Sequence, residues 1–148
     1  MGIFRSLKST IEKSKAAVVV QNLLEHQMHM GFLDVRPAAL ANQLVAEAWD
    51  ARPDIFNGKF GQRPHKITVA ACALAQGIDY LEPGSMVRSA LGIALGNILA
   101  ELDTNGRLYP LNSLDHQLLE EATAIFMSLT GEAEESLLED VTDLDRPG

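Results

Sequence analysis

The sequence predicts an all-α fold, a single compact bundle of five to six helices with a short acidic C-terminal tail. Hydrophobic residues make up 47% of the 148 residues, but aromatic residues make up only 5%. The core must therefore consist mainly of Ala, Leu, Ile and Val, which favours closely packed helices. Apolar residues recur at helical spacing between Pro, Gly and Asn-Gly breaks. A chain of this length suits one domain and needs no disulfide or metal to stabilise it.

The first predicted helix begins at the N-terminus and ends near Gly31. Ile3, Phe4, Leu7 and Ile11 fall within an arc of about 100° on this helix, with basic residues outside it. We expect this arc to dock on the protein's own core, and the more evenly apolar part beyond residue 16 to be buried more fully. The alternative is a cationic amphipathic helix in a membrane interface, with the same four side chains facing the lipid. The chain's first six residues also match the loose N-myristoylation pattern, which is a weak signal.

Two helices are predicted in the middle of the chain. The first runs from about Pro37, where proline is tolerated in the first turn, to about Trp49. The segment from Ala51 to His65 is rich in turn formers and should be irregular. From Lys66 to about Tyr80 the chain is apolar nearly all round, so its alanines and length favour a buried helix, although the β-branched residues at its start leave a strand open. Cys72, the only cysteine, is expected to be a buried, unreactive thiol whose pKa is raised by burial.

A further helix is predicted from Met86 to about Leu102, with Ser85 as its N-cap. Gly92 and Gly96 lie four residues apart on it, which lets another backbone approach closely. We expect the neighbour to be a helix of the same chain, and a dimer seam is the alternative.

The last long helix is predicted from about Ser113 to Thr130, closed by Gly131 as a C-terminal glycine. The chain then divides into a helical domain, residues 1–131, and an acidic tail, residues 132–148. The tail is expected to be disordered or to form one short helix around Leu137.

Negative charge is concentrated in this tail. The net charge of the chain is −8, and the residues after Gly131 hold seven acids and one base, a net charge of −6. We expect no nucleic-acid partner, because the neutralisation of phosphates by basic residues supplies much of that affinity. The single cysteine, the absence of a secretory signal and the lack of a long apolar run predict a cytoplasmic protein.

No catalytic or metal-binding motif stands out, so we assign no catalytic residue, no metal ligand and no cofactor. His26 and His29 lie three residues apart near two methionines, but nothing else in the sequence completes a site with three or four ligands. Asp115 and His116 could form an acid–base pair with a neighbouring glutamate. They fit better as charged residues on the surface at the start of a helix.

The segment from Arg52 to Lys66 is the predicted partner-binding surface. It combines four of the chain's 12 basic residues with aromatic side chains, which suits an acidic partner. The residues assigned to this surface are Arg52, Phe56, Lys59, Phe60, Arg63, His65 and Lys66. Long connections with glycine and proline are often functional. The alternative is a plain connector that its phenylalanines pin to the core. The same basic residues would also offer the acidic tail an intramolecular docking site.

These observations favour a non-enzymatic protein-interaction module, meaning a small adaptor, a regulator or a partner-specific chaperone. The sequence does not identify its protein partner. One alternative is a peripheral membrane-associated protein that uses the first helix, and another is an enzyme with an unrecognised site. A homodimer also stays open.

Overall fold

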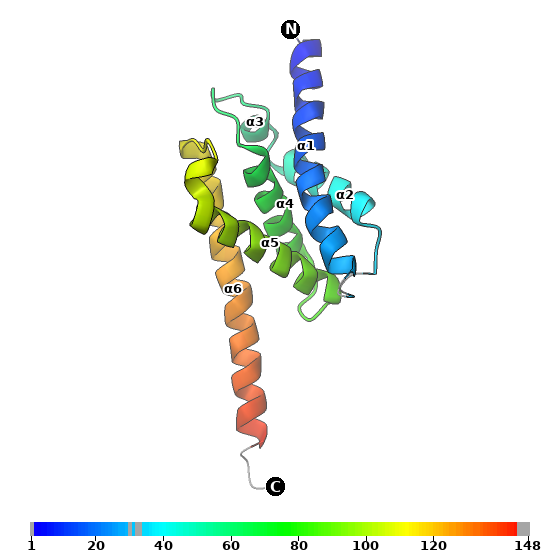
Figure 1. The fold of residues 1–148 in the computed structure, drawn as a ribbon, viewed down its shortest axis with the longest axis vertical. Coiled ribbons are helices and arrows are strands. Elements are labelled where there is room, and N and C mark those ends of the chain that lie inside the picture. The colour runs from blue at the N-terminus through cyan, green and yellow to red at the C-terminus, as the bar shows by residue number, and fades with distance from the viewer. Residues whose placement is uncertain (1, 30, 32–33, 145–148) are drawn as a thin grey trace.

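The computed structural model describes residues 2–29, 31 and 34–144, and the side chains of residues 7–29, 31 and 34–131. Within these ranges the chain forms six α-helices, one short 3-10 helix and no strand, which confirms the predicted all-α bundle (Figure 1). The elements are α1 (Gly2–His29), α2 (Pro37–Ala51), α3 (Pro53–Phe56), α4 (Lys66–Tyr80), α5 (Met86–Asn105), η1 (Gly106–Leu108) and α6 (Ser113–Leu144).

The centre of the fold is α4. It packs against α1, α2, α5 and α6, and ten of its 15 residues are buried. Figure 1 shows α1 and α2 on one side of α4 and α6 on the other. Its alanines let neighbouring helices approach from several sides, because helix axes can lie closer together where the side chains between them are small. The predicted buried helix is therefore confirmed, and the alternative of a strand at its start is wrong.

The described half of the apolar arc near the start of α1, namely Leu7 and Ile11, does not pack into the core. Leu7 is 56% exposed and Ile11 is 46% exposed, so the expectation that they dock on the core is wrong. The side chains of Ile3 and Phe4 lie outside the described residues. Further along α1 the expectation of burial holds in part, since Val20 is buried among other small apolar residues whereas Val18 is 54% exposed.

A polar contact lies on the side of α1 that faces inward. The Ser9 hydroxyl donates a hydrogen bond of 2.6 Å to the Asn57 Oδ1, and the Trp49 indole N–H donates to the same oxygen at 2.9 Å. The Lys13 ammonium lies 5.5 Å from the centre of the Trp49 ring, within the range of a cation–π interaction. Because the polar turn after α3 lies beneath this part of α1, a small polar side chain fits there better than the apolar arc.

The helix α6 continues through Gly131 to Leu144, so the prediction that Gly131 closes it is wrong. A glycine inside a helix costs about 1 kcal/mol relative to alanine, which the strong helix formers on either side offset. Its 32 residues span about 48 Å, and Figure 1 shows its C-terminal end beyond the other helices.

This course of α6 separates the acidic segment from the basic one. Figure 1 shows the end of α6 at the opposite end of the molecule from α3 and the connection that follows it. The predicted intramolecular contact between the acidic tail and the segment 52–66 is therefore absent from the part of the chain that the structure describes. No helix among the described residues is both long enough and apolar enough to cross a membrane.

Candidate functional site

The start of α6 anchors the connection between α3 and α4. Asn112 and Asp115 cap this helix reciprocally: the Asp115 N–H donates to the Asn112 Oδ1 at 2.8 Å, and the Asn112 N–H donates to the Asp115 Oδ2 at 2.8 Å. The Asp115 Oδ1 also accepts a hydrogen bond of 2.7 Å from the His65 backbone N–H. Asp115 is only 1% exposed, so its interpretation as a surface charge is wrong. Its neighbour His116 is exposed and does not share this network.

Several residues of the predicted partner-binding surface are engaged within the chain. The Arg52 guanidinium donates to both carboxylate oxygens of Glu121, at 2.6 and 3.5 Å. The Lys59 ammonium lies 3.5 Å from an Asp54 carboxylate oxygen. Phe56 is 1% exposed and stacks on Trp49, with the ring centres 5.3 Å apart, so its side chain is not accessible to a partner.

The rest of that surface divides between anchored and exposed side chains. The His65 ring caps α4, because its Nδ1 accepts a hydrogen bond of 3.1 Å from the Ile67 N–H. Burial lowers the pKa of His65, while the Asp115 carboxylate raises it to a smaller extent. The Arg63 carbonyl accepts a hydrogen bond from the Asn112 side chain, and one guanidinium nitrogen of Arg63 is buried without a hydrogen-bond partner. Phe60, which is 73% exposed, and the exposed Lys66 face the solvent.

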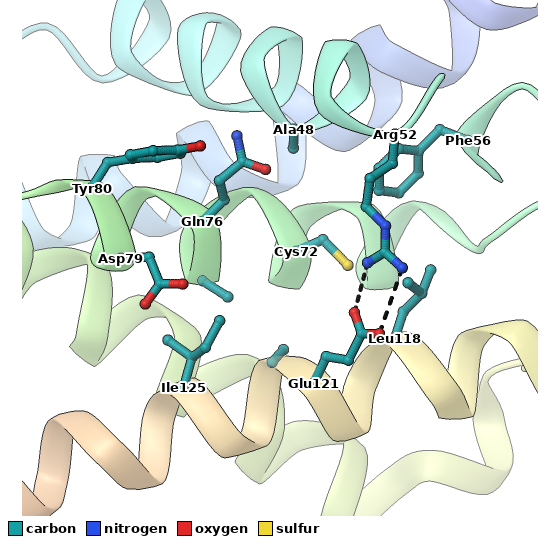
Figure 2. Close-up of a pocket in the computed structure, with 12 residues that line it drawn as sticks. Ala48, Arg52, Phe56, Cys72, Gln76, Asp79, Tyr80, Leu118, Glu121 and Ile125 are labelled. Carbon is teal, nitrogen blue, oxygen red and sulfur yellow. Dashed lines mark hydrogen bonds and ion pairs between the residues drawn. The ribbon is translucent and has the colours of Figure 1, made fainter. Parts of the chain in front are cut away.

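A pocket of about 450 Å³ opens between α2, α4 and α6 (Figure 2). Arg52, between α2 and α3, and Glu121 on α6 reach toward each other, and the Cys72 thiol lies beside them. Burial raises the pKa of Cys72 to about 12, which confirms that part of the prediction. The residue is half-buried rather than fully buried. Because the thiol stays protonated at neutral pH, the pocket holds no activated nucleophile at this position.

A larger, more apolar depression runs along α5 and α6. Two adjoining hollows of about 1020 and 540 Å³ share Gly96 and Phe126, so they form one continuous groove. We call it the α5–α6 groove. Its apolar lining comes mainly from Ile93, Gly96, Leu99, Leu119, Phe126 and Leu129, with Met127 at its edge.

Two glycines of α5 shape this groove. A Cβ at Gly92 would overlap the Leu129 side chain, and a Cβ at Gly96 would lie 3.0 Å from the Phe126 ring. The expectation that these glycines pack against a helix of the same chain is therefore confirmed. The leucines and the phenylalanine that line the groove are only half-buried, and Ile93 is 44% exposed. The groove thus keeps apolar side chains in contact with solvent.

The comparisons with known proteins do not extend this description. The chain matches no protein-family model, and no curated protein or solved structure is detectably similar to it. Within the described residues, no three His, Cys, Asp or Glu side chains gather closely enough to hold a metal ion. The candidate site therefore rests on the geometry of this chain alone.

Proposed function

We propose that this chain is a non-enzymatic interaction module, an adaptor or a regulator, that binds an amphipathic helix of a partner protein in the α5–α6 groove. The observation that carries the proposal is the continuous apolar lining that two helices contribute. Along α6 the groove extends from His116 to Thr130, a rise of about 21 Å or almost four helical turns. Grooves of this kind receive the apolar face of a helix through residues spaced three, four and seven apart.

The edge of the groove supports the same proposal. Met127 on α6 is 61% exposed and lines one hollow, and Ile93 on α5 is 44% exposed and lines the other. Burying an apolar side chain of this size contributes about 1.5–3 kcal/mol. Asp103, Arg107 and His116 provide polar groups at one end, which can fix the direction of a bound helix. The proposal includes a cytoplasmic location, which the single cysteine supports.

A photocrosslinking experiment tests this proposal. A photoreactive amino acid replaces Met127 in cells that express the chain, and the captured protein is identified and purified. Its affinity is then measured by calorimetry for the wild type, for Met127→Lys and for Met86→Lys. The last variant is a matched control, because Met86 is a methionine of similar exposure, 64%, outside the groove. We expect Met127→Lys to weaken binding by roughly tenfold or more, and Met86→Lys to leave it unchanged. Equal affinities for all three proteins would refute the proposal.

A second candidate function rests on α1. Leu7, Ile11 and Val18 are all exposed and lie four and seven residues apart, which puts them on one helical face. Lys8 and Lys15, also exposed, flank this row. A cationic helix with an exposed apolar row suits the surface of an anionic membrane.

Sedimentation with vesicles of phosphatidylserine and phosphatidylcholine separates this candidate from the first. A membrane-binding α1 predicts that the wild type sediments and that the double variant Leu7→Gln, Ile11→Gln does not. Met86→Gln is the control for the loss of an exposed apolar side chain elsewhere. A wild type that stays in the supernatant would eliminate this candidate.

A further inference from the structure

We propose that a second copy of this chain supplies a helix for the α5–α6 groove, namely residues 132–144 of α6, docked antiparallel in a two-fold symmetric dimer. This inference rests on the proposed function of the groove and specifies one occupant for it. Each copy would place its own C-terminal segment in the groove of the other. Such a contact uses the same surface twice and closes on itself, as expected for a symmetric dimer.

The apolar pattern of α6 continues past the groove. Phe126 and Leu129 line the groove, and in the sequence apolar residues follow at Ala133, Leu137 and Leu144. Positions 126, 133, 137 and 144 are separated by seven, four and seven residues, which corresponds to a single helical face. One apolar stripe therefore begins in the groove and runs on through the segment that leaves the body.

A packing partner would stabilise that segment. Residues 132–144 extend α6 by 13 residues, about 20 Å, beyond the helices that pack against its first half (Figure 1). A helical extension that nothing packs against is marginal in water, because most helical stability in proteins comes from the packing of an apolar face. Burial of the apolar stripe would supply the missing stabilisation.

Measured along α6 from Gly131, the groove on one side and the projecting segment on the other have similar lengths. The groove reaches back along α6 to His116, fifteen residues before Gly131, and the helix continues to Leu144, thirteen residues after it. If two copies of α6 cross beside Gly131, residue 133 of one lies near residue 129 of the other. Likewise, position 143 lies near position 119. The projecting segment of each copy then covers the groove of the other from Leu129 to Leu119, and only the end at His116 stays uncovered.

Electrostatics favours the antiparallel arrangement over the parallel one. Each segment after Gly131 carries a net charge of −6, so side-by-side parallel docking would bring two such segments into contact. In the antiparallel arrangement their midpoints lie about 21 Å apart along the axis, roughly two screening lengths at 0.1 M salt. The acidic end of each segment also approaches the end of the groove where Arg107 and His116 are exposed beside one acid, Asp103.

Sedimentation equilibrium of the full chain and disulfide trapping test this inference together. We expect the wild type to be a dimer at micromolar concentration. Leu137→Asp should weaken the dimer by roughly a hundredfold, because each dimer loses two buried leucines. It should keep the circular dichroism of the helical body, since position 137 lies beyond it. Met127→Lys should weaken the dimer as well, whereas Met86→Lys should not.

The trapping experiment reports the direction of the helices. Two proteins, each with Cys72→Ala, carry either Met127→Cys or Leu137→Cys. When mixed and oxidised, they should form a disulfide with each other, because antiparallel α6 helices bring positions 127 and 137 together. Efficient self-linking of the Leu137→Cys protein would indicate parallel helices and overturn the inference.

The outcomes also separate this inference from the proposed function. A monomeric wild type at 100 μM, or a dimer that survives both Leu137→Asp and Met127→Lys, refutes the inference. If Met127→Lys nevertheless loses an identified crosslinked partner, the proposed function stands without it. If trapping yields the 127–137 disulfide but binding of every captured partner is insensitive to Met127→Lys, the dimer stands and the adaptor function fails.

Discussion

Gly96 on α5 faces Phe126 on α6 so closely that a Cβ at Gly96 would lie 3.0 Å from the phenylalanine ring. Both residues belong to the two hollows that make up the α5–α6 groove. The absence of a side chain at position 96 therefore serves two purposes, since it lets the ring pack against α5 and keeps the middle of the groove open.

Replacing Gly96 with leucine should destabilise the fold. The new side chain would overpack its contact with Phe126, at a cost of about 1–3 kcal/mol in the free energy of unfolding. Urea denaturation followed by circular dichroism measures this loss. Gly106→Ala is the control, because nothing lies within 4 Å of the Cβ position there and the backbone φ of −55° suits alanine. Equal loss in both variants would show that the Gly96–Phe126 contact is not tight.

Asp115 should be essential for joining α6 to the start of α4. Its carboxylate accepts hydrogen bonds from two backbone N–H groups, those of His65 and Asn112. Asp115→Ala leaves both donors without this acceptor, and we expect a loss of about 2–3 kcal/mol. Glu120→Ala removes an exposed carboxylate five residues further along α6 and should change stability by less than about 0.5 kcal/mol. Similar unfolding midpoints for the two variants would contradict this account.

The stability of the protein should fall in mild acid because of His65. In the folded state, burial lowers the pKa of His65 below its ordinary value of 6.5. The Nδ1 of His65 accepts its hydrogen bond from Ile67 only when it is unprotonated. The unfolded state therefore binds a proton first as the pH falls. The contribution of His65 is fully present above about pH 6.5 and is lost as the pH drops toward the lower pKa of the folded state. His65→Asn keeps a neutral N-cap acceptor and should show a shallower loss between about pH 7 and pH 5. Parallel stability profiles would rule out His65 as the cause.

Cys72 should react slowly with thiol reagents at neutral pH. Its pKa of about 12 leaves almost no thiolate, although the side chain borders a pocket. A colorimetric thiol assay should show slow labelling of the folded protein and fast labelling after denaturation. Rapid labelling without denaturant would mean that the pocket activates the thiol.

The sequence was sufficient to predict the elements whose surroundings are apolar on all sides. The segment from Lys66 to Tyr80 had to be buried whichever way it was turned, and it forms the central helix. Ser85 was predicted to cap α5, and its hydroxyl accepts a hydrogen bond from the Arg88 N–H. Gly92 and Gly96 predicted a close helix contact without identifying α6 as the neighbour.

The orientation of α1 could not be predicted in the same way. Spacing shows that Leu7 and Ile11 share a face, but it does not show whether that face meets the core or the solvent. The face that meets the core is the one with the buried Val20 and Leu24, and Ser9 on that face bonds to Asn57, 48 residues away. The groove was missed for a related reason, because Leu119 and Phe126 look like core residues in the sequence. In the structure α5 covers these two side chains incompletely, so both are half-buried.

Hydrogen exchange of residues 132–144 at several protein concentrations tests most directly the central claim that the C-terminal helical segment of a second copy occupies the α5–α6 groove. If a second copy holds this segment in the groove, its backbone amides should be protected at micromolar concentration and should lose protection on dilution. Met127→Lys should abolish the protection at every concentration, while the amides of α4 should stay protected throughout as an internal control. Fast exchange of residues 132–144 at all concentrations, or protection that neither dilution nor Met127→Lys alters, would contradict the account.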